Sequence, residues 1–123
     1  MTRPSTPLQG APPLEGSLDR QLALSRVGGD LDLLKEIAHL FVEDYPKLLK
    51  DLQQAIASGD AVAVERTAHG LKGSVSTFGA RTAMEAARSI ESLGRARQLS
   101  GLHPLLQTLE AALAALRPEL EAL

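Results

Sequence analysis

Cysteine and tryptophan are absent from the 123-residue sequence, and the aromatic residues amount to one tyrosine and two phenylalanines. The lack of cysteine excludes disulfides, thiolate metal sites and thiol chemistry. It also fits a reducing compartment, so we expect a cytoplasmic protein. No run of about 18 apolar residues is present, and the N-terminus lacks the apolar stretch of a signal peptide. We therefore expect no membrane insertion.

Charge of neither sign predominates. The formal net charge is −2, and 23% of the residues are charged. This balance does not indicate binding to nucleic acid or to a membrane surface, so a partner must be recognised by shape and local charge.

Leucine and alanine take the place of the aromatic residues and recur at intervals of three or four, which is typical of helices that bury one face. Cap and turn residues divide this pattern into a short helix and four longer ones, at about 18–25, 31–58, 61–78, 81–93 and from 104 onward. Pro46 predicts a kink or a break near Asp44, and Pro118 predicts an end or a kink in the last helix. The sequence therefore predicts an all-α protein, an antiparallel four-helix bundle with a short additional N-terminal helix.

Residues 1–16 differ in composition from the remainder, because they hold four prolines among serine, threonine and glycine. Such a segment buries little apolar surface, which predicts a disordered tail or linker at 1–16 and a folded domain at 17–123. An ordinary frayed terminus is an equally good interpretation.

The helix expected at about 61–78 carries a polar face that takes no part in packing the core. If its apolar stripe is set at zero, His69 lies roughly 140° away on the solvent side, with Lys72 at about 80° and Gly73 at about 180°. Ser76 falls near His69 on this face, at about 120°. Arg66 precedes them by one turn.

These residue types suit phosphoryl transfer. An exposed imidazole, with an ordinary pKa of about 6.5, is mostly neutral and nucleophilic at neutral pH. Lys72 would neutralise part of the phosphoryl charge, and Gly73 would let a second protein approach. Glycine inside a helix costs about 0.5–1 kcal/mol relative to alanine, and Gly70 and Gly73 share one helix. Spacing alone still leaves an ordinary solvated polar face open.

The segment also resembles the signature of the histidine phosphotransfer family, through Ala68, His69, Leu71, Lys72, Gly73, Ser74, Gly79 and Ala80. The likeness extends over residues 17–116 and includes Glu91 on the third bundle helix. The resemblance implies a bundle that carries a phosphoryl group on His69, assisted by Lys72, with Gly73 giving access and Ser76 near the imidazole. Gly70 departs from the family, which usually has a bulkier residue there.

The resemblance further implies response-regulator receiver domains as partners, or a hybrid sensor histidine kinase. The Mg²⁺ ion would belong to the receiver, and this chain would hold no cofactor or metal and no ATP site. We expect a monomer. Two alternatives stay open: a scaffold that binds a receiver or partner helix without phosphorylation, and the first domain of a chemotaxis-type kinase. A dimerising helical domain is a third.

Other candidate residues have simpler interpretations. His39 and Glu43 are four residues apart, which favours surface charge pairing over weak metal binding. His103 precedes Pro104 and is expected in a turn or cap. Apolar residues at the rim of the docking surface are expected among Leu40, Val42 and Phe78, with partial burial in the core as the competing interpretation.

Overall fold

The computed structural model describes residues 18–123, which form five helices and no strand. They are α1 (Arg20–Arg26), α2 (Leu31–Ser58), α3 (Ala61–Thr77), α4 (Arg81–Arg95) and α5 (His103–Glu121). The tail expected at 1–16 lies outside the described residues. No helix of the described part is long and apolar enough to cross a membrane.

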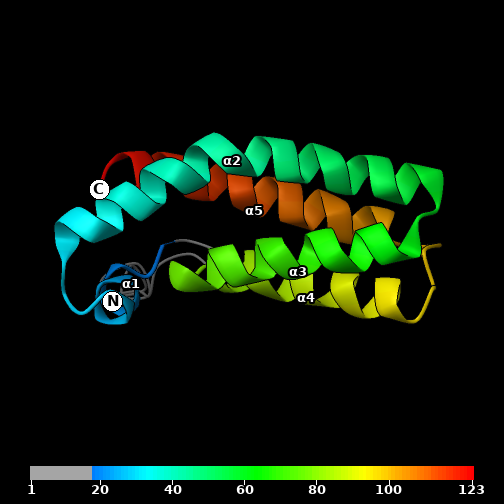
Figure 1. Ribbon diagram of the computed structural model, residues 1–123, viewed down its shortest axis with the longest axis horizontal. Helices are drawn as coiled ribbons and strands as arrows, with labels where there is room; N and C mark the ends of the chain where they lie inside the picture. The colour runs from blue at the N-terminus through cyan, green and yellow to red at the C-terminus, as the bar shows by residue number, and fades with distance from the viewer. Residues whose placement is uncertain (1–17) are drawn as a thin grey trace, which may run out of the picture.

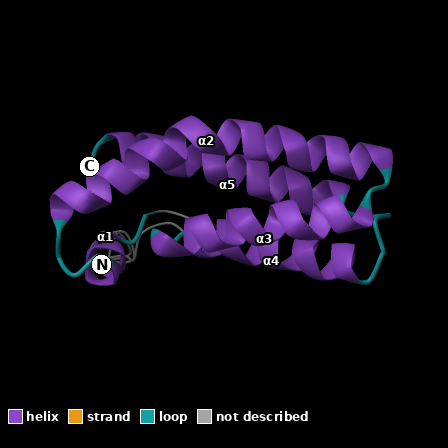
Figure 2. Cartoon of the chain, viewed as in Figure 1, coloured by secondary structure: helices purple, strands orange, loops and turns teal. Residues whose placement is uncertain are grey.

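The four long helices run alternately up and down and form an antiparallel bundle (Figure 1). Each packs against two others, α2 against α3 and α5, and α4 against α3 and α5. The short α1 lies across one end of the bundle, beside the α3–α4 turn (Figures 1 and 2). There the Asp19 amide donates to the Phe78 carbonyl at 2.9 Å. The predicted all-α architecture is therefore confirmed.

Aspartates begin three of the helices. The side chains of Asp19, Asp30 and Asp60 accept hydrogen bonds from amides three residues further on, at 3.1, 3.0 and 3.1 Å. Each bond satisfies a donor that has no partner inside the helix. Gly59, with φ of 74°, ends α2 in the left-handed conformation that glycine adopts without strain.

The prolines interrupt the helices less than the sequence suggested. Pro46 lies inside α2, which continues from Leu31 to Ser58 without a break, although its N-terminal third runs at an angle to the rest (Figure 1). Pro118 lies inside α5, which continues to Glu121. Packing of both helices into the bundle outweighs the single backbone hydrogen bond that each proline removes.

The core consists mainly of leucine and alanine, as the sequence indicated. α3 and α4 approach most closely, and Gly94 explains why. A Cβ atom at Gly94 would lie 2.9 Å from the Glu65 amide nitrogen and 3.1 Å from Val64 Cγ1. Gly94 was expected near the end of α4, which runs one residue further, to Arg95. Its contact shows that it also sets the α3–α4 spacing.

Candidate functional site

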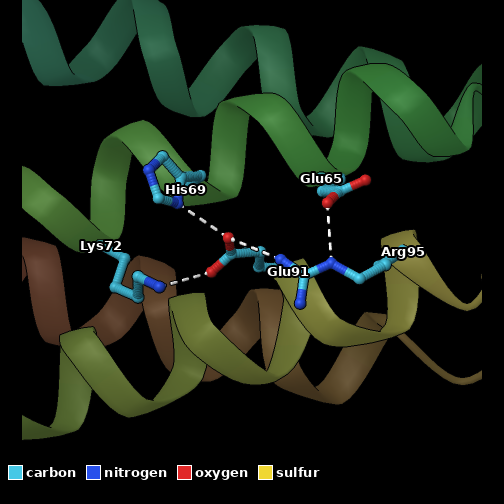
Figure 3. Close-up of polar contacts among 5 residues, drawn as sticks. All are labelled: Glu65, His69, Lys72, Glu91 and Arg95. Carbon is cyan, nitrogen blue, oxygen red and sulfur yellow. Dashed lines mark hydrogen bonds and ion pairs between the residues drawn. The ribbon is translucent and has the colours of Figure 1, made fainter.

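His69 projects from the middle of α3 at the seam between α3 and α4 (Figure 3). Its side chain is 69% exposed, as the helical spacing predicted. Core residues Ala68 and Leu71 hold the opposite face of the helix in the bundle. The imidazole is therefore displayed to water from a helix whose position is fixed by packing.

A buried carboxylate binds the inner edge of this imidazole. Glu91, on α4, has a side chain only 6% exposed, and its Oε2 lies 2.7 Å from His69 Nδ1. Its other oxygen, Oε1, lies 2.7 Å from Lys72 Nζ. Glu91 thus joins the two residues that the sequence placed in the site (Figure 3).

The Glu91 carboxyl is ionised at neutral pH. Its pKa is lowered chiefly by the hydrogen bond from Lys72, and also by the hydrogen bond from His69, while burial acts in the opposite direction. An ionised carboxylate only accepts hydrogen bonds, so His69 Nδ1 must carry the proton and donate it. Nε2 is then left with its lone pair, on the outer side of the ring.

Arg95 completes the cluster from the next turn of α4. Its Nη2 lies 3.3 Å from Glu91 Oε2, and its Nε donates to Glu65 Oε2 at 2.9 Å. The bond to Glu65 raises the pKa of Arg95, so this guanidinium stays charged. The bond to Glu65 joins α4 to α3 beside the histidine, whereas the contact with Glu91 lies within α4 (Figure 3).

The two glycines of α3 leave open surface beside His69. A Cβ atom at Gly70 or Gly73 would meet nothing within 4 Å. Neither glycine is therefore required by packing, and both have an ordinary helical backbone. The space expected at Gly73 is present, and its role in giving a partner access stays a prediction.

The supporting residues Arg66 and Ser76 lie in different surroundings. Arg66 is exposed and lines, with His69, Glu91 and Arg95, a groove of about 390 Å³ between α3 and α4. The Ser76 hydroxyl donates to the Gly73 carbonyl at 2.9 Å, one turn back along the helix. Its bond goes to the backbone, so its expected place near the imidazole stays a prediction.

The three rim candidates differ in exposure. Leu40 is 53% exposed and Val42 is half-buried, but Phe78 is 0% exposed and belongs to the core. Its expected place on the surface is wrong, because Phe78 caps α3 and packs against Phe41, with ring centroids 5.5 Å apart. Leu40 does line a shallow groove between α2 and α3.

The other histidines do not join the site. His39 contacts Glu43 at 3.3 Å on the exposed face of α2, so it pairs at the surface as expected. His103 is the first residue of α5. Within residues 18–123 no group of three or more histidine or acidic side chains is arranged to hold a metal ion.

Sequence reasoning did not assign a role to Glu91, although a signal was present. Buried positions of α4 fall at Ala83, Ala87, Ile90 and Gly94, and position 91 lies on the same face. A glutamate at a core position requires charged or hydrogen-bonding partners, and the facing helix offers His69 and Lys72.

The model of the Hpt domain family matches residues 36–119 of the chain. The chain belongs to the Hpt domain family. Its function is histidine phosphotransfer in a phosphorelay, so a bundle that only binds partners does not describe this Hpt domain.

Solved structures agree with this assignment. Histidine-containing phosphotransfer protein B from Pseudomonas aeruginosa matches with 28% identity and a TM-score of 0.78, over 85% of this chain and 91% of its own. The HPT domain of a sensor hybrid histidine kinase from Shewanella has the same fold, with 20% identity, a TM-score of 0.77, and coverage of 87% and 92%. A search of curated protein sequences found no match.

Proposed function

We propose that His69 is the residue of this Hpt domain that is phosphorylated, and that Nε2 is the attacking atom. The observation that carries the proposal is the hydrogen bond of 2.7 Å between His69 Nδ1 and the buried Glu91. It leaves the lone pair of Nε2 directed away from the bundle, where a partner protein can reach it. Exposure of the ring lets the partner bring its phosphoryl group in line with that nitrogen.

In the transfer, Nε2 forms a bond to the phosphorus of a phospho-aspartate on the partner receiver domain. The bond from phosphorus to the aspartate oxygen breaks, and the partner's carboxylate leaves. Positioning and neutralisation of charge provide most of the catalysis in such a step. We propose that Mg²⁺ and the aspartate belong to the receiver, and that the chain adds the nucleophile and a docking surface.

Lys72 contributes positive charge beside the ring. Its side chain is 29% exposed and its ammonium contacts Glu91, so it is held within reach of the face that the partner covers. The arriving phosphoryl group carries about two negative charges, which a neighbouring ammonium stabilises. Arg66 lines the same groove and adds positive charge, whereas the charge of Arg95 is offset by its bond to Glu65. We also propose that Ser76 supports the site from a position near the imidazole.

Gly73 provides access in this proposal. The open surface at Gly73 lets the partner's backbone and its carboxylate approach the ring without displacing a side chain. The partners are response-regulator receiver domains, or a hybrid sensor histidine kinase that carries one. We further propose that the domain acts as a monomer in the cytoplasm and binds no nucleic acid.

The test is transfer of labelled phosphate from a phosphorylated receiver to the full chain. We expect acid-labile, base-stable label on the wild type and on His39→Gln, which alters an exposed histidine on α2. We expect none on His69→Gln. Label on His69→Gln at the wild-type level, or full function of that variant in a relay, would refute the assignment of His69.

A further inference from the structure

The hydrogen bond between Glu91 and His69 affects the protonation of the imidazole ring after phosphorylation. When Nε2 gains a phosphoryl group, the ring still carries its proton on Nδ1 and becomes a positively charged phosphoimidazolium. In water that proton leaves readily to solvent. In this chain it is directed at a carboxylate that is 6% exposed and 2.7 Å away.

We propose that Glu91 is a positioning residue that keeps this proton on Nδ1 of phosphorylated His69, which makes the phosphoryl group easy to pass on. This inference rests on the proposed function of His69. When the phosphorus–nitrogen bond breaks, a protonated ring leaves as neutral imidazole, with the electron pair on Nε2. An unprotonated ring would leave as the imidazolide anion, which is a far poorer leaving group. Glu91 therefore favours relay over storage.

The surrounding charges determine whether the Glu91 carboxylate alone is sufficient to keep the proton on Nδ1. The groove around the ring is lined by α3 and α4 alone, with Glu65 and Arg66 from α3 and Glu91 and Arg95 from α4. Lys72, also on α3, contacts Glu91 Oε1, whereas the ring contacts Oε2.

Several of these charges offset one another. The charge of Arg95 is offset by its bond to Glu65 at 2.9 Å, and its longer contact with Glu91 Oε2, at 3.3 Å, is present in both ring states. The positive charges of Lys72 and Arg66 disfavour a positively charged ring, but the two negative charges of the phosphoryl group favour it. The direct hydrogen bond to Glu91 is then the contact that discriminates between the two ring states.

The experiment loads the full chain with phosphoramidate, in which Nε2 displaces ammonia, and follows the phosphohistidine by ³¹P NMR. Glu91→Gln keeps the size of the side chain and removes its charge. Glu85→Gln is the control, because it removes an exposed α4 carboxylate that pairs with Arg88 and lies outside the cluster around the ring. Loss of a contacting charge changes the protonated fraction of the ring by about tenfold or more above its titration midpoint. At pH 8 we expect the phosphohistidine of Glu91→Gln to hydrolyse about tenfold more slowly than that of the wild type, and that of Glu85→Gln to hydrolyse within about twofold of the wild-type rate.

A second measurement does not depend on any variant. We expect the ³¹P signal of the wild-type phosphoprotein to titrate at a higher pH in the folded state than in urea, where the Glu91 contact is lost. ¹⁵N shifts of the ring report the proton on Nδ1 directly. Equal midpoints in both states, or equal lifetimes of the wild type and Glu91→Gln, would overturn the inference and leave phosphorylation of His69 standing. Failure of the wild type to form any phosphohistidine would overturn both.

Discussion

Replacing Gly73 by alanine should stabilise the fold and slow phosphotransfer at the same time. The added methyl group meets nothing within 4 Å, so it causes no clash. Gly73 lies in the interior of α3, where alanine is favoured over glycine by about 0.5–1 kcal/mol. For a domain of this size that gain corresponds to a rise in Tm of about 2–6 °C.

The same methyl group stands where a receiver must approach His69. We expect Gly73→Ala to react with phosphoramidate at the wild-type rate, because a small donor needs little space. We expect its rate of transfer from a phosphorylated receiver to fall by about tenfold or more, which corresponds to about 1.4 kcal/mol in the barrier. Thermal unfolding measures the change in Tm, and labelling time courses with phosphoramidate and with the phosphorylated receiver measure the two rates.

Gly70→Ala is the matched control for stiffening of the helix. It lies in the same helix, is also exposed and is equally free of contacts, so it should raise Tm by a similar amount. We expect it to retain more transfer than Gly73→Ala. If Gly73→Ala accepts phosphate from the receiver as fast as wild type, Gly73 does not provide access and our reasoning about this surface is wrong. If Gly70→Ala is slowed equally, helix stiffness rather than access explains the effect.

The remaining predictions concern stability. Glu91→Gln should lower the free energy of unfolding by about 1.5–3 kcal/mol at pH 7. Because the pKa of Glu91 is lowered in the folded state, its contribution is present above the ordinary value of 4.5 and is lost as pH falls through the lower folded-state value. Urea titrations should therefore show a smaller difference in unfolding free energy between the wild type and Glu91→Gln below pH 4 than at pH 7. The same difference at both pH values would contradict this. Gly94→Ala should cost about 1–3 kcal/mol by urea titration, because its Cβ would lie 2.9 Å from backbone on α3, and a neutral effect would show that the helices adjust freely. Asp60→Ala should cost about 1 kcal/mol through loss of the bond to the Ala63 amide, with Asp51→Ala, which loses only a pairing with Lys47 inside α2, as the control.

The helices and their order could be predicted from the sequence because local rules decide them. Aspartates cap three helices, glycines with positive φ follow α1, α2 and α3, and the apolar stripes lie on one side of each helix. The exposure of His69 followed from the same periodicity. α1 was placed to within two residues at its start, because the capping aspartate at position 19 was read as part of the helix.

What could not be predicted depends on contacts between helices. Periodicity places Glu91 on the buried face of α4, but the register of α4 against α3 decides which side chains meet it. Phe78 was a candidate for the rim of the docking surface, and it is the last residue of the apolar stripe of α3, next to Gly79. The segment that begins α1 and the ring of Phe41 on α2 lie against it at that end of the bundle. The register between helices and the surfaces that neighbouring elements cover depend on how the whole bundle packs, so a single sequence does not determine them by local rules.

The glycines show how packing and function divide one residue type. Gly94 is required where α3 and α4 touch, and that close approach lets the α4 carboxylate Glu91 reach His69 and Lys72 on α3. Gly73 is not required by any contact in the chain and weakens its own helix. A bundle optimised for stability alone would keep the first and replace the second. The site therefore depends on one glycine that brings the helices together from inside and on another that leaves room for a second protein outside.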